Sequence, residues 1–238
     1  DDAAVKICQS KTFDNATSCS SENSLVLLEE NYDQAIDALE RAGGFLVPAE
    51  KHDTIAATLW QDGKLNRHLI ARDVAILADA FGLGELPAGT KYLMVEETGI
   101  GPDAPLSGEK LSLVLTVYRA SDFAHAKALV RDILNFQGIG HSCGIHTGLP
   151  ERPRELAEEL DVVRVLVNQA HTFGNGGSFE NALPFTLSMG CGTWAGNSIS
   201  ENLNYRHFIN VTHLVRTVAE DRPAEDEMFG GYWDKYGR

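Results

Sequence analysis

The sequence predicts an α/β protein with an open, mostly parallel sheet, helices on both faces, and an added edge strand near the C-terminus. Short apolar runs alternate with longer segments in which apolar residues recur every three or four positions, the pattern of strands joined by helices. The chain has 238 residues, of which 43% are hydrophobic, and that is enough to bury a sizeable core. No internal repeat indicates a solenoid instead.

The first third of the chain alternates strand and helix. Residues 24–30 are a short, mostly apolar run typical of a buried strand. Residues 31–44 follow at once with apolar residues at helical spacing, Asn31 as the expected N-cap and a glycine pair as the stop. The next expected elements are a strand over 45–48, ended by proline, and helices over 52–63 and 67–82.

The middle of the chain continues this alternation. The expected elements are strands over 91–97 and 111–119, a helix over 121–138, and a helix running into a strand over 153–168. Ser121 is the expected N-cap of the third of these, and Gly138 its stop. Regular alternation of this kind favours a parallel sheet covered by helices on both faces.

The last third has a different character. From Asn168 to Asn204 the chain is rich in Gly, Ser and Asn, and so long a polar segment in a compact domain is usually functional. Residues 204–218 alternate as an edge strand does, which predicts pairing with another subunit. We therefore expect a main domain over residues 1–203, and an oligomerisation strand with a charged, aromatic tail over residues 204–238 that makes a homo-oligomer.

Composition excludes several classes of function. The formal net charge of −14 argues against a nucleic-acid or anionic-membrane partner, since binding to either needs clustered Lys and Arg. No apolar run approaches the roughly 18 residues of a membrane span, and no signal peptide opens the chain. The four scattered cysteines resemble reduced thiols rather than a disulfide framework. We expect a cytoplasmic protein whose partners are small molecules.

Cys19 is distinguished by its small, polar neighbours in the run "NATSCSSENS". A structural cysteine usually lies in an apolar setting, whereas this one is expected on an accessible bend. Nearby backbone N–H groups and hydroxyls can stabilise a thiolate, the form that attacks electrophiles. The alternative is a loop cysteine with no role.

A second candidate is the glycine-rich run "GIGHSCGIHTG", which holds His141, Cys143 and His146. Their spacing suits metal ligation, but a closed zinc site needs four ligands, so no metal is assigned. The preferred interpretation is a bend that presents His141 to a cleft as an acid, base or hydrogen-bond donor. For His146, packing at the end of a strand is preferred.

Two further segments bear on ligand binding. Residues 176–203 contain Phe185, Met189 and Trp194, which are suited to wall a pocket, among glycines that let backbone approach a ligand closely. Residues 82–89 have two glycines at dinucleotide-loop spacing, but they follow an expected helix rather than a strand. If the protein uses a dinucleotide, the main phosphate-binding element is missing from this chain.

Four motifs in order resemble one family: "SKTFDNATSCSSENS", "SGEKLSLVLTVYRASDF", "GIGHSCGIHT" and "LPFTLSMGCGTWAGNSISENLNYRHFINVTHL". They are similar to the C-terminal catalytic part of the CoA-acylating aldehyde dehydrogenases and, within these, to the sulfoacetaldehyde dehydrogenases, up to about Arg216. The resemblance implies that family's catalytic-domain fold, NAD or NADP as cofactor, and an aldehyde (sulfoacetaldehyde is one candidate) and CoA as substrates. It also implies that an N-terminal nucleotide-binding domain is absent here, so this chain alone is expected to be inactive as a dehydrogenase.

The resemblance carries roles onto single residues. Cys19 stands where the family has the nucleophile that forms a thioester, Glu109 where it has a glutamate that reaches the nicotinamide-side ribose, and Phe185 near the substrate entrance. His141 is expected to take the proton of the CoA thiol. Two alternatives stay open: a cysteine-dependent acyltransferase or hydrolase that uses Cys19 with His141, and a non-catalytic assembly domain.

Overall fold

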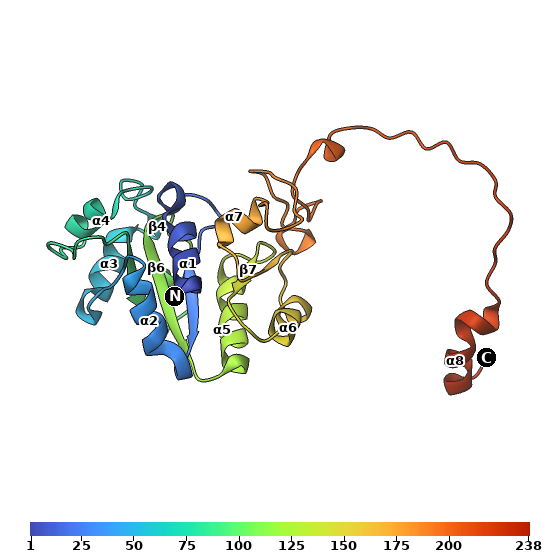
Figure 1. Ribbon diagram of the computed structural model, residues 1–238, viewed down its shortest axis with the longest axis horizontal. Coiled ribbons are helices and arrows are strands. Elements are labelled where there is room, and N and C mark those ends of the chain that lie inside the picture. The colour runs from blue at the N-terminus through green and yellow to red at the C-terminus, as the bar shows by residue number, and fades with distance from the viewer. The chain divides into compact units, whose positions relative to one another are not determined.

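The computed structural model describes residues 1–238 as two compact units, Asp1–Asn204 and Tyr205–Arg238 (Figure 1). The first unit holds the helices α1 (Asp2–Thr12), α2 (Tyr32–Arg41), α3 (His52–Leu59), α4 (Val74–Ala80), α5 (Phe123–Phe136), α6 (Glu151–Glu159) and α7 (His171–Asn175). Its strands are β1 (Ser24–Leu28), β2 (Gly44–Leu46), β3 (Trp60–Gln61), β4 (Lys64–Leu65), β5 (Tyr92–Glu96), β6 (Val114–Ala120), β7 (Cys143–Ile145) and β8 (Val165–Val167).

The main sheet has four parallel strands in the order β1-β6-β5-β2. Its central strands β5 and β6 are almost wholly buried, and Leu93 and Val114 pair across them with no exposure to solvent. Strands covered on both faces have continuous apolar sequences, as these two do. Helices α2 and α5 flank the sheet on opposite sides (Figure 1). The predicted α/β class with a parallel sheet is confirmed.

The predicted single open sheet is interrupted. Strands β7 and β8 pair in parallel with each other in a separate two-stranded sheet, and β3 and β4 form a small antiparallel pair. The β7–β8 sheet has its own small core, in which Cys143, Leu156, Leu160 and Val162 are buried against one side of α5. Strand β1 remains at the edge of the main sheet, and all five of its residues are only half-buried. A groove therefore remains open beside β1.

Several element boundaries differ from the sequence-based expectation. Asp122, not Ser121, caps α5, because its Oδ1 accepts a hydrogen bond of 2.8 Å from the His125 backbone N–H. Helix α4 begins only at Val74, since Ala71 has a φ of 57°, which no α-helix contains. The helices α1 and α7 and the strand β7 were not expected from the sequence.

The second unit contains one helix, α8 (Glu225–Tyr236), with two ring pairs at i,i+4 spacing. The centroids of Phe229 and Trp233 lie 5.7 Å apart, and those of Tyr232 and Tyr236 lie 4.9 Å apart. Residues 208–224 contain no helix or strand. The predicted edge strand over 204–218 is therefore not formed within this chain, because a strand needs a neighbouring edge to bond with. No helix of the structure has the length and apolar character that crossing a membrane requires.

Candidate active site

Cys19 lies in the turn that joins α1 to β1. Three consecutive residues before it, Asp14, Asn15 and Ala16, have φ values of 49°, 48° and 62°, so the chain reverses sharply there. The reversal leaves Cys19 exposed. The neighbouring hydroxyls of Ser18 and Ser20 lie 2.8 Å from each other. They bond to one another rather than to the thiol, contrary to the expectation that they stabilise a thiolate.

His141 lies two residues before β7, after a turn that needs glycine. Gly140 has a φ of 82°, and a Cβ at this position would collide with the carbonyl oxygen of Cys191. The close approach of these two backbones holds the turn against the segment that contains Cys191. The turn directs the imidazole toward Cys19, where His141 Nε2 lies 3.3 Å from Cys19 Sγ. The structure thus brings together two residues that are 122 positions apart in the sequence.

Both members of this pair favour their neutral forms. Burial lowers the pKa of His141, and the charge of Arg164 lowers it further. Partial desolvation by the walls around the otherwise exposed thiol raises the pKa of Cys19, and the charges of Glu109 and Cys191 raise it further. The resting pair is therefore a thiol beside a neutral imidazole. His141 Nε2 can accept the thiol proton, which fits a general base better than a preformed ion pair.

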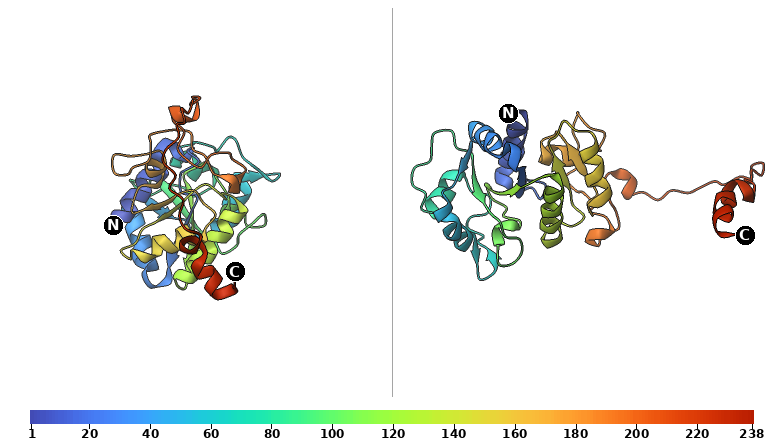
Figure 2. Two further views of the ribbon diagram at one scale, coloured as in Figure 1. Left: turned by 90° about the vertical axis from the view of Figure 1, so that its right-hand side faces the viewer. Right: turned by 90° about the horizontal axis from the view of Figure 1, so that it is seen from below.

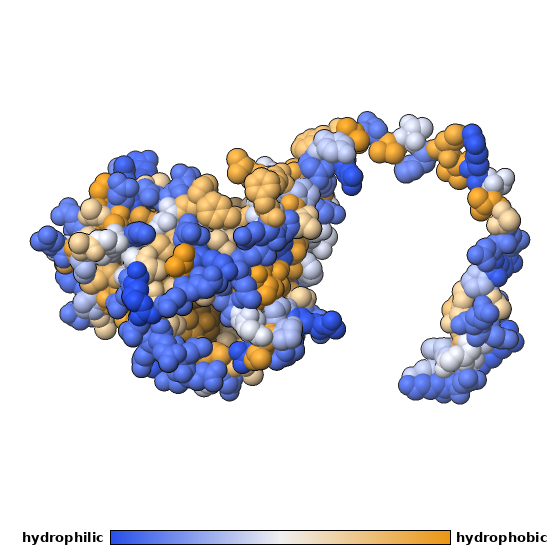
Figure 3. All heavy atoms as spheres, in the orientation of Figure 1, coloured by the Kyte–Doolittle hydropathy of each residue, from blue (hydrophilic) through white to orange (hydrophobic).

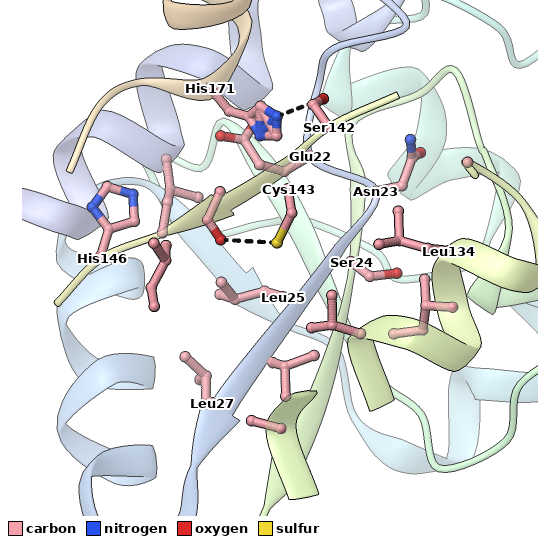
Figure 4. Close-up of a pocket in the computed structure, with 18 of the residues that line it drawn as sticks. Glu22, Asn23, Ser24, Leu25, Leu27, Leu134, Ser142, Cys143, His146 and His171 are labelled. Carbon is pink, nitrogen blue, oxygen red and sulfur yellow. Dashed lines mark hydrogen bonds between the residues drawn. The ribbon is translucent and has the colours of Figure 1, made fainter. Parts of the chain in front are cut away.

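Cys19 and His141 form the wall between two cavities. A larger cavity of about 890 Å³ lies along β1, α5 and β7, and a smaller one of about 630 Å³ lies under residues 187–203. Only Cys19 and His141 line both. Figure 3 shows a recess with an apolar floor beside β1, and Figure 4 shows side chains of the larger cavity, with Leu25 and Leu27 of β1 and Leu134 of α5.

Glu109 lines the larger cavity together with Cys19. Its backbone N–H donates a hydrogen bond of 2.7 Å to Gln137 Oε1, which ties the segment before β6 to the end of α5. Its charge raises the pKa of Cys19, so the carboxylate lies within electrostatic range of the thiol. The geometry is compatible with the role that the family resemblance implies for Glu109.

Phe185 does not line either cavity. It is 61% exposed and packs on Phe179, with the two ring centroids 5.2 Å apart. The same loop instead places Leu187 and Met189 in the wall of the smaller cavity. Of the residues expected to wall a pocket, Met189 does so and Phe185 does not. Trp194 also lies outside both cavities.

Arg164 was not singled out from the sequence. Its guanidinium is buried and donates to neutral oxygens: Asn202 Oδ1 at 3.0 and 2.7 Å, Gly190 O at 3.1 Å and Ser200 O at 3.4 Å. These bonds fasten the loop of the smaller cavity to the start of β8. They also place a positive charge close enough to Cys19 to lower its pKa. The signal in the sequence was a single arginine inside the apolar run "VVRVLV".

The residues considered for a metal site do not converge. The structure holds no group of three or more His, Cys, Asp and Glu side chains placed to hold a metal ion. Cys143 is buried, and its thiol donates to the carbonyl oxygen of Gly144 at 3.5 Å. Burial raises the pKa of Cys143 to about 12, which disfavours the thiolate that a metal would need.

Comparison with known proteins gives relatives along the whole chain, although no model of a protein family matches it. The chain is 47% identical over 239 residues to a sulfoacetaldehyde dehydrogenase (acylating) of Cupriavidus necator, and 42% identical over 244 residues to one of Bilophila wadsworthia. Each alignment covers 100% of this chain, but only 48% and 52% of the relative. The chain thus spans about half the length of the curated relatives it matches.

Solved structures agree with these relatives. The acetylating aldehyde dehydrogenase from Geobacillus thermoglucosidasius superposes with a TM-score of 0.85 and 30% identity, over 92% of this chain and 49% of that one. The resemblance predicted from the four sequence motifs is confirmed. The chain is similar along its whole length to acylating aldehyde dehydrogenases, and it corresponds to about half the length of these relatives.

Proposed function

We propose that this chain is the catalytic domain of an NAD(P)-dependent, CoA-acylating aldehyde dehydrogenase, which converts an aldehyde to its acyl-CoA through a thioester on Cys19. The observation that carries the proposal is the 3.3 Å approach of His141 Nε2 to Cys19 Sγ in the wall shared by two cavities. A nucleophile and its base lie within hydrogen-bond reach. The cavities give the acyl group and the second reactant separate room on either side of the thiol.

The first step is addition of Cys19 to the aldehyde. His141 Nε2 accepts the thiol proton while Sγ forms a bond to the carbonyl carbon, and the carbonyl oxygen becomes an alkoxide that needs hydrogen-bond donors. The Cys19 backbone N–H lies beside its own thiol, where it lowers the pKa of Cys19, and it is the nearest such donor. A bound nicotinamide supplies the hydride acceptor that turns this adduct into a thioester.

The second step returns the enzyme to its starting state. His141, having released its first proton, accepts the proton of the CoA thiol, and the CoA sulfur then attacks the thioester carbon. Cys19 leaves as a thiolate and is protonated again. Because the attacking thiol is itself a strong nucleophile, no carboxylate is needed to activate a water molecule.

The residues of this chain fit one end of a nicotinamide dinucleotide. Glu109 lines the same cavity as Cys19, and in this proposal its carboxylate accepts hydrogen bonds from ribose hydroxyls near the thiol. None of the sequence motifs forms a phosphate-binding glycine loop. We therefore assign only the nicotinamide-side ribose to this chain, through Glu109.

Sulfoacetaldehyde is the aldehyde we propose, because the relatives at 47% and 42% identity carry that substrate in their names. A sulfonate is an anion, and the protein has a net charge of −14, so the site needs a local positive field. Arg164 provides one, since its buried guanidinium bonds only to neutral oxygens, one of them the carbonyl oxygen of Gly190, a residue that lines the smaller cavity. We place the aldehyde in this cavity, with Leu187 and Met189 beside its methylene group.

The remaining assignments concern organisation. We propose that residues 1–203 make up the catalytic domain and that residues 204–238 carry a strand and tail for homo-oligomerisation. Residues 208–224 expose several large apolar side chains, among them Leu214 and Val215 at 80% and 86% exposure. Such side chains are usually covered by another chain. We also propose a cytoplasmic location, from the four scattered and unpaired cysteines.

The reverse half-reaction tests this function without the nicotinamide. Incubation with acetyl-CoA should transfer one acetyl group to Cys19 and release free CoA, as intact-mass and peptide mass spectrometry would measure. Cys19→Ser should abolish the transfer, and His141→Ala should slow it. Acetylation spread evenly over the four cysteines would contradict the proposal. Rapid hydrolysis of the thioester in the absence of CoA would support the alternative of a cysteine-dependent hydrolase.

A further inference from the structure

On the Nδ1 side, away from Cys19, the imidazole of His141 is held by a series of hydrogen bonds. Its Nδ1 lies 2.6 Å from the hydroxyl oxygen of Ser142, and that same oxygen lies 2.9 Å from Nε2 of His171 (Figure 4). With the 3.3 Å contact to Cys19, the four side chains form one continuous series. All four line the larger cavity.

This series crosses three separate parts of the fold. Cys19 comes from the turn before β1, His141 and Ser142 from the turn before β7, and His171 from the first residue of α7. Gly144 leaves room for the ring of His171, because a Cβ at Gly144 would lie only 3.2 Å from His171 Nδ1. The position of His171 is therefore fixed by packing as well as by its bond to Ser142.

The hydroxyl of Ser142 has one proton and two imidazole neighbours, and two arrangements use that proton within this series of hydrogen bonds. In the first, Ser142 donates to His171 and accepts from His141 Nδ1–H, which leaves Nε2 of His141 free to accept the Cys19 proton. In the second, Ser142 donates to His141 Nδ1 and accepts from His171 Nε2–H, so that His141 carries its proton on Nε2. His141 can act as a base only in the first arrangement.

His171 is neutral near pH 7, so one of its two ring nitrogens is available as an acceptor. Burial, with smaller contributions from the neighbouring His141 and His146, lowers its pKa to about 4. The carboxyl group of Glu22 also lies near it and accepts from the His171 backbone N–H. Burial raises the pKa of Glu22 to about 7, and the buried Lys11 lowers it.

Other charged groups lie near the Cys19 end of this series of hydrogen bonds. Glu109 and Cys191 raise the pKa of the Cys19 thiol, and Arg164 lowers the pKa of both Cys19 and His141. His146, at the end of β7, faces Lys6 and Asp2, and burial is the main cause that lowers its pKa. None of these groups is within hydrogen-bond distance of the Ser142 hydroxyl, whose recorded partners are the two imidazoles.

We infer that Ser142 and His171 are positioning residues, which hold the proton of His141 on Nδ1 and so keep Nε2 ready to accept a thiol proton. The inference rests on the proposed Cys19–His141 pair and deepens it. Ser142 also stabilises the protonated ring, because the imidazolium donates from Nδ1 to its oxygen. His171 acts through Ser142 and touches neither thiol nor substrate.

The pH dependence of Cys19 alkylation tests this inference on the chain as it is. Ser142→Ala removes the acceptor from His141 Nδ1, so the second-order rate with iodoacetamide at pH 7 should fall roughly tenfold, the effect of one charge-assisted hydrogen bond. Above the pKa of the Cys19 thiol the rates of variant and parent should converge, because hydroxide then removes the proton. Ser142→Thr keeps the hydroxyl and should retain the parent profile.

His171→Phe provides an independent arm and also covers the case in which Ser142→Ala fails to fold. Loss of the His171 acceptor lets Ser142 donate to His141 Nδ1, so the rate at pH 7 should again fall. The double variant should lose no more than Ser142→Ala alone, because both act through one bond. Ser121→Ala is the matched control, since Ser121 also bonds to a histidine, His125, but neither lines a cavity.

The outcomes distinguish the positioning role of Ser142 and His171 from the Cys19–His141 pair itself. A changed profile for His141→Ala with a parent profile for Ser142→Ala and His171→Phe would overturn the positioning role and leave the Cys19–His141 pair in place. A parent profile for His141→Ala would overturn both. A rate lowered equally at every pH, with no convergence at high pH, would indicate a structural defect and contradict the inference.

Discussion

The burial of His171 makes the stability of the protein depend on pH in a way that can be calculated. Its pKa falls from an ordinary 6.5 to about 4, with burial as the main cause. Because the folded-state pKa is depressed, the unfolded chain binds the proton more tightly. His171 therefore stabilises the folded state fully above pH 6.5, and this contribution is lost as the pH falls toward 4.

The size of the effect follows from the two pKa values. At pH 5 the unfolded side chain is almost wholly protonated and the folded one is almost wholly neutral, which is worth about 2 kcal/mol relative to pH 7.5. His171 keeps some exposed surface at the cavity, so this figure is the upper end of the expected range. It remains a large part of the 5–15 kcal/mol that roughly spans the stability of whole domains.

The assay compares His171→Phe with the parent by urea unfolding at pH 7.5 and pH 5. Phenylalanine has no proton to gain, so the difference in unfolding free energy between the two proteins should shift by up to about 2 kcal/mol in favour of the variant at pH 5. Glu22 and Lys11 titrate in both proteins and cancel in this comparison. A difference that is the same at both pH values would refute the account of His171.

Three other predictions are independent of this one. Limiting iodoacetamide should label Cys19 before Cys143, which is buried with a pKa raised to about 12, and peptide mapping would detect the reverse order. Hydrogen bonds to Asp53 and Glu97 raise the pKa of His52, so the stabilisation that His52 contributes is present below pH 6.5 and lost as the pH rises. His52→Gln should therefore lower the unfolding free energy more at pH 5 than at pH 8, a pH dependence opposite in sign to that of His171→Phe. An equal loss at both pH values would contradict the assignment. Arg164→Met leaves several buried oxygens without donors and should lower the unfolding free energy by about 3 kcal/mol, and an unchanged urea midpoint would refute that role.

Local sequence patterns predicted the elements whose apolar pattern lies within their own residues. The helix α2 has its apolar residues at regular spacing, and the strands β5 and β6 are mostly apolar runs, so both kinds of element could be found from the sequence. Strand β7 has three residues within a glycine-rich run, and it exists because β8, some 20 residues later, offers an edge. No local pattern carries that information. The same is true of α7, which has only five residues.

The same distinction holds for the candidate active site, where residue types could be read from the sequence but contacts between distant residues could not. Residue type and neighbourhood were enough to select Cys19 and His141 as candidates, yet their contact joins residues 122 positions apart, which no local pattern shows. The backbone N–H of Cys19 favours the thiolate, as predicted, but desolvation and the charge of Glu109 outweigh it, so the net pKa of Cys19 is raised. Composition shows which polar groups are near in sequence, and only the fold shows which of them are already bonded, as Ser18 and Ser20 are.

A raised thiol pKa suits a site that must release as well as capture an acyl group. In the proposed cycle Cys19 leaves the thioester when CoA attacks, and a thiol of higher pKa leaves more slowly but adds to a carbonyl more strongly. The balance then depends on His141, whose lowered pKa lets it give up one proton before it accepts the next. A strongly basic imidazole would hold the first proton and block the CoA step. Desolvation disfavours the Cys19 thiolate and also keeps His141 neutral. This shared cause fits both residues to the proposed cycle, in which two thiols are deprotonated by one base.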